Sequence, residues 1–439
     1  MKQRVFKGEI TVFLSLLFVL MLSLVGALLQ SASIHIARSR KRADMQMALE
    51  SVFAEYHKEL FDEYGIFARE VEQDAGIARR LEFYGVEQTE HRIQSRRLLS
   101  DGMGQAFYEQ ALLAMREKEF DASIGGSDNG FLNNGTPSFE QEESQAGMNL
   151  DEILSQEGQE MPQEDNPIVS VKELKKGSLL SLVCPKEQEL SDKGVELSSL
   201  ASHRRLQKGS AKYQVSNKSG AEEKLVFLAY LAEHFTDYSK QKETKGLSYE
   251  SEYLLSGLSS DKENLEAAVK KLLTIRMVAN YTYLQTDAAR KAEAEAMALT
   301  LSSLLTIPGA TEIVKQVLLF SWAYGESVVD LRVLLKGKRV PAVKSDETWQ
   351  LQLANLAKLG TQEESVTEGD GSKGLSYADY LKLLLALEDS NSLCMRALDL
   401  MECRLGIRTD TCVTAMEIRS VYALPRGLED SFVSSYAYH

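Results

Sequence analysis

The residues from Ile10 to Leu29 form an uncharged, almost wholly apolar run of twenty residues. A helix of that length rises about 30 Å, which matches the hydrocarbon core of a bilayer. We therefore expect a transmembrane helix over residues 9–31. A cleaved secretory signal is the alternative, but such signals have an apolar core of only about 7–15 residues. The longer run, followed by the basic cluster Arg38–Arg42, favours a retained anchor in the cell membrane.

The charge of the chain limits its partners. The formal charge is −14, and residues 1–42 contribute seven basic residues and one acidic residue, so the rest of the chain carries −20. A body this acidic is not expected to bind nucleic acid. Basic residues flank the apolar run in nearly equal numbers on both sides, so the positive-inside rule alone gives no orientation.

Composition and hydrophobic spacing divide the remaining chain. Apolar residues at helical spacing predict that the anchor continues as an amphipathic stalk that ends at Gly65. A stretch rich in Gly, Asn, Ser, Gln and Glu predicts a flexible acidic linker. The predicted order is a basic leader (1–8), a transmembrane helix (9–31), a stalk helix (32–64), the first part of the body (65–120), the linker (121–170), and the main helical body with a C-terminal strand (171–439).

Helical patterns dominate the body. Thr311–Leu335 is the most apolar of them, but charged residues interrupt it, so we expect the central helix of a soluble core rather than a second span. Three segments instead alternate like half-buried strands: Val86–Leu98, Ser248–Ser256 and Cys412–Tyr422. The predicted fold class is α+β, predominantly helical, with a small antiparallel sheet packed on helices.

The sequence contains no recognisable catalytic or cofactor motif. No cysteine or histidine spacing suits a metal, so we expect no metal site, no cofactor and no enzymatic activity. Of the four cysteines, Cys412 is placed to fold back towards Cys394 or Cys403. Cys403–Cys412 is the candidate disulfide, and buried free thiols are the alternative.

Two features of the anchor suggest assembly. Ser23, Ala27 and Ser31 recur every four residues, and such small-residue stripes allow helices to approach closely in lipid. The basic leader ends in Gly8 directly before Glu9 and the apolar run, as in prepilin-type signals. Gly8 and Glu9 therefore form a candidate processing site, with cleavage after Gly8.

Several segments resemble a functionally uncharacterised family of membrane-anchored proteins of Gram-positive bacteria, which are similar at their N-termini to TadE/TadG-like pseudopilins of the Tad (tight adherence) pilus system. The segments that carry this resemblance are Lys7–Leu16, Met47–Tyr56, Leu60–Phe67, Tyr249–Gly257, Ser260–Leu265, Trp322–Asp330 and Leu375–Leu381. The resemblance implies a cytoplasmic N-terminus and an extracytoplasmic body. One departure is Phe13, which stands where prepilin-type segments carry Glu.

The sequence thus favours a non-enzymatic, single-pass membrane protein, an accessory or minor pseudopilin-like component of a Tad-type pilus or secretion system. Its expected partners are the bilayer and other Tad-type subunits, bound through the transmembrane helix. The alternatives are a membrane-tethered ligand-binding or scaffold ectodomain, or a cell-envelope enzyme without a recognisable motif.

Overall fold

The chain forms two compact units in the computed structural model. The sheet unit comprises Met1–Gln110, Arg205–Ser216 and Ile407–His439, and the helical unit comprises Ala111–Arg204 and Asn217–Gly406. The structure describes residues 7–71, 74–86, 89–116, 130–156, 160–162, 166–185, 188–212, 218, 220–240, 245–305, 310–360 and 373–438. Helices predominate and the sheet is small and antiparallel, so the predicted fold class is confirmed.

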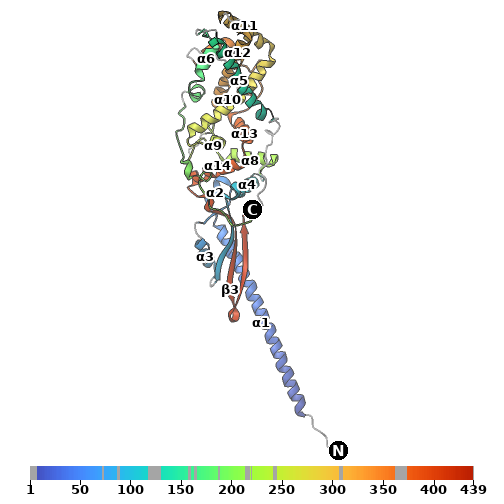
Figure 1. Ribbon diagram of the computed structural model, residues 1–439. Helices are drawn as coiled ribbons and strands as arrows, with labels where there is room; N and C mark the ends of the chain where they lie inside the picture. Colours follow the sequence, from blue (N-terminus) through green and yellow to red (C-terminus); the bar gives the residue numbers. More distant parts are fainter. Residues whose placement is uncertain are drawn as a thin grey trace, which may run out of the picture. The chain divides into compact units, whose positions relative to one another are not determined.

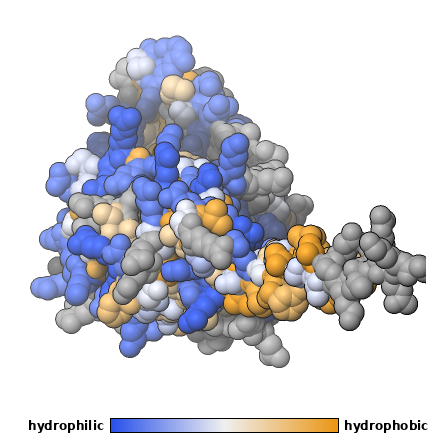
Figure 2. Space-filling model, turned by 90° about the horizontal axis from the view of Figure 1, so that it is seen from below, coloured by the Kyte–Doolittle hydropathy of each residue, from blue (hydrophilic) through white to orange (hydrophobic). Residues whose placement is uncertain are grey.

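The longest element is α1, Lys7–Ala54, in the sheet unit (Figure 1). Its large apolar side chains from Ile10 to Leu29 are 47–67% exposed, and they form the orange surface of the helix in Figure 2. Among the described residues, α1 is the one helix that is long and apolar enough to cross a membrane. A membrane anchor and a signal sequence share this property.

Beyond Leu29, one side of α1 is covered. Half-buried and buried residues recur every three or four positions, as an amphipathic helix requires: Gln30, Ile34, Ala37, Lys41, Met45, Ala48, Leu49 and Val52. This stripe faces the sheet. It joins a hydrophobic core with residues of the strands and of α3, Asp74–Phe83.

The predicted stalk is not one helix up to Tyr64. The chain leaves α1 after Ala54, and the N–H of His57 donates to the carbonyl oxygen of Ala68 at 2.8 Å. His57 Nδ1 then accepts the N–H of Leu60 at 3.2 Å and caps a separate helix, α2, Lys58–Tyr64. Gly65 ends α2 with a left-handed φ of 65°, at the predicted position.

The sheet has a long central strand, β3, Cys412–Leu424. On one side β3 pairs with β2, Thr89–Leu98, and on the other with β4, Leu428–Ala437, and the short β1, Arg69–Glu70. All pairs are antiparallel. β2 and β3 confirm two of the three predicted strands. β4 was not predicted; it follows β3 through the short turn Pro425–Gly427.

An aromatic cluster joins the end of α1 to the end of β4. The rings of Phe53 and Tyr436 stack with centroids 4.6 Å apart, and the Tyr438 ring lies edge-on to Phe53 at 5.4 Å. The Tyr438 hydroxyl also donates to the carbonyl oxygen of Phe53. These contacts fix the helix against the last strand of the chain.

The helical unit is built around α12, Ala310–Leu335, whose side chains are buried along most of its length. This agrees with the prediction of a central core helix. α12 contacts α5, α6, α7, α10 and α11. The helices other than α1 to α3 are α4 Asp101–Arg116, α5 Gly130–Gln156, α6 Pro167–Leu174, α7 Leu179–Val183, α8 Ala221–His234, α9 Glu250–Ser256, α10 Asp261–Thr286, α11 Ala288–Leu305, α12, α13 Tyr377–Leu387 and α14 Ser390–Leu405.

Two predictions need correction in the helical unit. Most of the described part of the predicted linker is helical, because α5 and α6 lie in it. α5 buries Leu150 and Leu154, which are one turn apart on the same side of the helix. The many polar residues around them led to the prediction of a linker. The third predicted strand, Ser248–Ser256, is mostly the helix α9. Glu250 and Glu252 are buried there, so the alternation of polar and apolar residues did not mark a solvent-facing side.

The predicted main body, 171–439, is also not one unit. Its last residues, Ile407–His439, belong to the sheet unit, where they supply β3 and β4. The first part of the body, 65–120, is likewise divided between the two units after Gln110. The sheet unit is therefore assembled from both ends of the chain.

Candidate functional site

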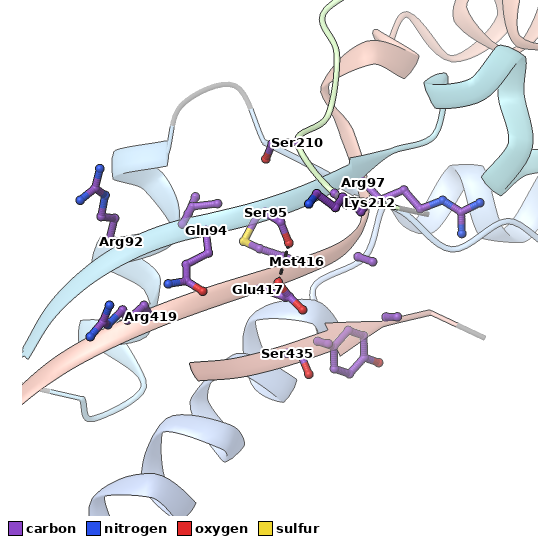
Figure 3. A pocket seen from close by; sticks show the side chains of 15 residues that line it. Arg92, Gln94, Ser95, Arg97, Ser210, Lys212, Met416, Glu417, Arg419 and Ser435 are labelled. Carbon is purple, nitrogen blue, oxygen red and sulfur yellow. Dashed lines mark hydrogen bonds between the residues drawn. The ribbon is translucent and has the colours of Figure 1, made fainter. Parts of the chain in front are cut away.

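An open groove with a volume of about 980 Å³ crosses the outer face of the sheet (Figure 3). It lies on the face opposite α1, because Ile418 points into the core shared with α1 while Glu417 and Arg419 are exposed. Its floor consists of residues from β2, β3 and β4, and its wall is formed by 210–212 of the sheet unit.

The wall is held at the free edge of β2. The N–H groups of Ser210 and Ala211 both donate to the carbonyl oxygen of Arg96, at 2.9 and 3.0 Å. The N–H of Gly209 donates to Asp101 Oδ1 at 2.9 Å. A Cβ at residue 209 would lie 2.1 Å from Asp101 Oδ2, so only glycine fits this approach.

The groove is lined with more cations than anions. Arg92 and Arg419 are direct partners on neighbouring strands, and Figure 3 shows both at the same end of the groove. Lys212 belongs to the wall. No carboxylate pairs with these three side chains in the part of the chain that the structure describes. The acidic group of the lining is Glu417, which accepts the hydroxyl proton of Ser95 at 2.8 Å.

The side chains of this groove suit the binding of an anion. Among the described residues of the lining, the carboxylate is that of Glu417, and its partner is the Ser95 hydroxyl. No cluster of potential metal ligands occurs among the described residues. Guanidinium and ammonium groups without acidic partners can bind a carboxylate or phosphate group.

A second group, in the helical unit, contains a serine, a histidine and an aspartate. Ser202 Oγ donates to Asp399 Oδ2 at 2.5 Å and lies 2.7 Å from His203 Nδ1. The hydroxyl of Tyr253 donates to the same aspartate oxygen at 2.9 Å. In a catalytic triad the histidine lies between the serine and the aspartate. Here the aspartate binds the serine directly, so the geometry is not that of a triad.

Four charged residues meet in the core of the helical unit. The side chains of Arg276, Glu326, Asp330 and Lys344 are each at most 1% exposed. Lys344 Nζ lies 2.5 Å from Glu326 Oε1 and 2.7 Å from Asp330 Oδ1, and Arg276 Nη2 lies 2.9 Å from Asp330 Oδ2. Two cations therefore balance two anions. We call these four residues the buried charge cluster.

Burial and partners act in opposite directions on the two acids of this cluster. Burial raises the pKa of Glu326 above its ordinary value, although Lys344 opposes the change. Burial alone would also raise the pKa of Asp330, but Arg276 and Lys344 together lower it. The cluster is closed to solvent, and its hydrogen bonds attach the 341–351 segment to α10 and α12. Its role is structural.

A buried carboxyl group also joins α9 to α13. Glu252 is fully buried, and it accepts the Tyr377 hydroxyl at 2.9 Å and the N–H of Tyr238 at 3.0 Å. Burial raises the pKa of Glu252 to about 8. Burial thus favours the protonated form of this carboxyl group.

The residues predicted as sites are not brought together. Ser23, Ala27 and Ser31 are exposed along α1, and the Ser23 hydroxyl donates to the carbonyl oxygen of Leu20 at 2.8 Å. Gly8 and Glu9 lie in the first turn of α1, and residues 1–6 of the leader lie outside the described residues.

The candidate disulfide is absent, because all four cysteines are free thiols. Cys412 is buried in β3 of the sheet unit, while Cys403 lies in α14 of the helical unit. Burial raises the pKa of the Cys184 and Cys403 thiols to about 11 and that of Cys394 to about 12. These three thiols are weak nucleophiles at neutral pH.

The groove and both buried groups were missed by sequence reasoning. A local signal existed for one of them: Glu326 and Asp330 are one turn apart in the most apolar helical pattern of the body, which indicates a buried partner. The partner, Lys344, carries no such signal. For the groove, Arg92 and Arg419 are more than three hundred residues apart in the chain, so only the fold reveals their pairing.

The chain belongs to a family of unknown function, DUF5702, whose model matches residues 157–424, more than half of its length. The matched region contains most of the helical unit and all of β3, whereas α1, β2 and β4 lie outside it. No curated protein and no solved structure is significantly similar to the chain.

Proposed function

We propose that this member of the DUF5702 family is a non-enzymatic, single-pass membrane protein with an extracytoplasmic body, and that it serves as an accessory or minor pseudopilin-like component of a Tad-type pilus or secretion system. The observation that carries the proposal is α1. Its first part exposes a continuous apolar surface, and its second part is packed against the sheet. One continuous helix thus joins an exposed apolar segment to a folded body.

The proposed assembly role rests on the exposed face of this helix. Ser23, Ala27 and Ser31 lie on one side of it and are uncovered, which leaves the stripe available to another transmembrane helix. The Tad-type assignment and the orientation rest on the resemblance of segments such as Lys7–Leu16 to pseudopilin-like proteins.

The anchor is tested by extracting isolated membranes with alkaline carbonate. We expect the full-length protein to stay in the membrane pellet. In intact cells, we expect protease added to the medium to digest its body. Release by carbonate would contradict the anchor, and protection from external protease would contradict the orientation. N-terminal sequencing of the extracted protein tests processing, since a start at Glu9 is expected if Gly8 is the cleavage site.

The stripe is tested by oxidative cross-linking in membranes of cells that express the Tad-type machinery. We expect Ser23→Cys to form a cross-linked product with a cysteine-substituted Tad-type subunit or a second copy. Val25→Cys is the matched control, because it lies at nearly the same depth on another side of the helix. Equal cross-linking of both variants would refute a specific packing face.

A membrane-tethered ligand-binding ectodomain is the second candidate, and the groove favours it. Arg92 and Arg419 face each other as like charges, an arrangement that lowers the stability of a sheet. Binding of an anionic partner would offset this cost. The test is binding of a hexaglutamate peptide to the wild type and to the Arg92→Gln/Arg419→Gln variant; equal affinities would exclude the groove as an anion site.

A further inference from the structure

The strand β4 runs beside α1 and in the same direction (Figure 1). Near one end, Arg38 Nε lies 2.6 Å from Asp430 Oδ2, and near the other, Phe53 stacks on Tyr436. The fifteen residues from Arg38 to Phe53 rise about 22 Å along the helix, and the six residues from Asp430 to Tyr436 span about 20 Å along the strand. The two lengths agree, so the elements are aligned.

This alignment locates the turn between β3 and β4 along the axis of α1. Leu428 precedes Asp430 by two residues, so it lies about 7 Å nearer the N-terminal end of α1 than Arg38 does. That height corresponds to about Ile34 of the helix. The half-burial of Ile34 and Gln30 on α1 agrees with this position, because protein covers the helix down to that level.

The apolar run indicates where the membrane lies along α1. If residues up to Leu29 occupy the hydrocarbon core, Ile34 lies about 7 Å beyond its edge. The headgroup region on each side of the core is roughly 5–8 Å thick. The turn therefore falls at the headgroup layer of the same bilayer.

The side chains of the turn suit this location. Leu428 is 48% exposed, whereas its strand partner Leu424 is only 6% exposed. Leu424 closes the core between the sheet and α1, and Leu428 extends beyond it. An exposed leucine at the end of a hairpin gains free energy when the interface of a bilayer removes it from water.

We propose that the tip of the β3–β4 hairpin is a second membrane contact, made by the exposed Leu428, and that it lies in the headgroup layer of the bilayer crossed by α1. The inference rests on the proposed function only in that α1 is the anchor. With two contacts of different kinds on one rigid unit, the sheet unit is held at a fixed height above the lipid. The Arg38–Asp430 ion pair and the aromatic cluster around Phe53 transmit this constraint to α1.

The test uses full-length protein reconstituted in vesicles of phosphatidylcholine and phosphatidylglycerol that contain a clickable lipid. A photoreactive benzoylphenylalanine replaces Leu428 in one variant and Val433 in a second. Val433 is the matched control, since it lies on the same strand with a similar exposure of 45% and about 16 Å farther from the membrane. A third variant carries the probe at Phe18, within the apolar run.

We expect lipid adducts at residues 18 and 428, with the yield at 428 at least fivefold above that at 433. Adducts at 18 with equal, low yields at 428 and 433 would overturn the hairpin contact while leaving the anchor intact. A cross-linked protein dimer in place of a lipid adduct at 428 would also overturn it. Absence of adducts at 18 would refute the anchor and with it this inference. A protease digestion pattern identical to that of the wild type controls for folding of each variant.

Discussion

Replacing Lys344 by methionine tests whether the buried charge cluster holds the helical unit together. Lys344 Nζ is the cation nearest to both Glu326 and Asp330, and all three side chains are fully buried. Removing one member of a buried ion pair generally costs about 3–5 kcal/mol, because the remaining charge has no compensating partner. The substitution leaves two acids and one cation in a closed site.

The remaining contacts limit this cost. Arg276 still pairs with Asp330 at 2.9 Å, and the N–H groups of Gln350 and Leu351 still donate to Glu326 at 3.0 and 2.7 Å. Glu326, whose pKa burial already raises, can bind a proton instead of staying charged. We therefore expect a loss near the lower limit, about 3 kcal/mol at neutral pH. The loss should be smaller at acidic pH, where protonation is easier.

The matched variant is Glu326→Gln combined with Lys344→Met, which removes one charge of each sign. Arg276 and Asp330 remain as a balanced pair, so the double variant should be more stable than Lys344→Met alone, by about 1–2 kcal/mol. This order of stabilities is the specific result that charge balance predicts. A simple packing effect would make the double variant less stable than either single variant.

Urea unfolding followed by tryptophan fluorescence measures these differences. The chain has two tryptophans, Trp322 and Trp349, and both indole N–H groups donate to the carbonyl oxygen of Leu351 at 2.8 Å. The fluorescence therefore reports on the segment that the cluster attaches to α12. If Lys344→Met lowers the free energy of unfolding by less than about 1 kcal/mol, the reasoning from buried charge is wrong.

Three further predictions concern other parts of the chain. Glu252 has a pKa of about 8 in the fold against an ordinary value of 4.5, so the free energy of unfolding should fall as the pH rises through this window. Glu252→Gln should reduce this fall between pH 5 and pH 8. An unchanged fall would contradict the raised pKa of Glu252. Gly209→Ala should destabilise the groove wall by about 1–3 kcal/mol in thermal unfolding, whereas Gly76→Ala, with open space around it, should not. Arg92→Thr should raise stability by a few tenths of a kcal/mol, because it removes the like charge opposite Arg419; a loss would show that the pair is not repulsive.

Two elements that the sequence predicted well carry the signal within their own residues. In β3 the buried Ile418 alternates with the exposed Arg419, so hydropathy follows the strand period. The apolar run of α1 is identified by length and hydrophobicity alone. In both cases the environment of a residue depends on its own element, and local pattern is enough.

The failures occur where polar side chains are buried with distant partners. In α9 the carboxylate of Glu250 binds Arg404 at 2.7 Å, so a polar residue occupies an inward position and imitates a strand pattern. In α5 the reverse holds, since two leucines among many polar residues are enough to pack the helix against α12. Such positions depend on residues far away in the chain, and a local pattern cannot reveal them.

The sheet unit brings together segments that lie far apart in the sequence. β3 and β4 cover the inner stripe of α1, and β3 also pairs with β2. His91 and Ser420 are separated by 329 residues, so their contact closes a long loop and costs more chain entropy than a local contact does. The core that α1 shares with α3 and β2 is completed by residues of β3: Val413, Met416, Ile418, Tyr422 and Leu424. The packing of the second part of α1 on the sheet therefore depends on β3 and β4, which lie far from α1 in the sequence.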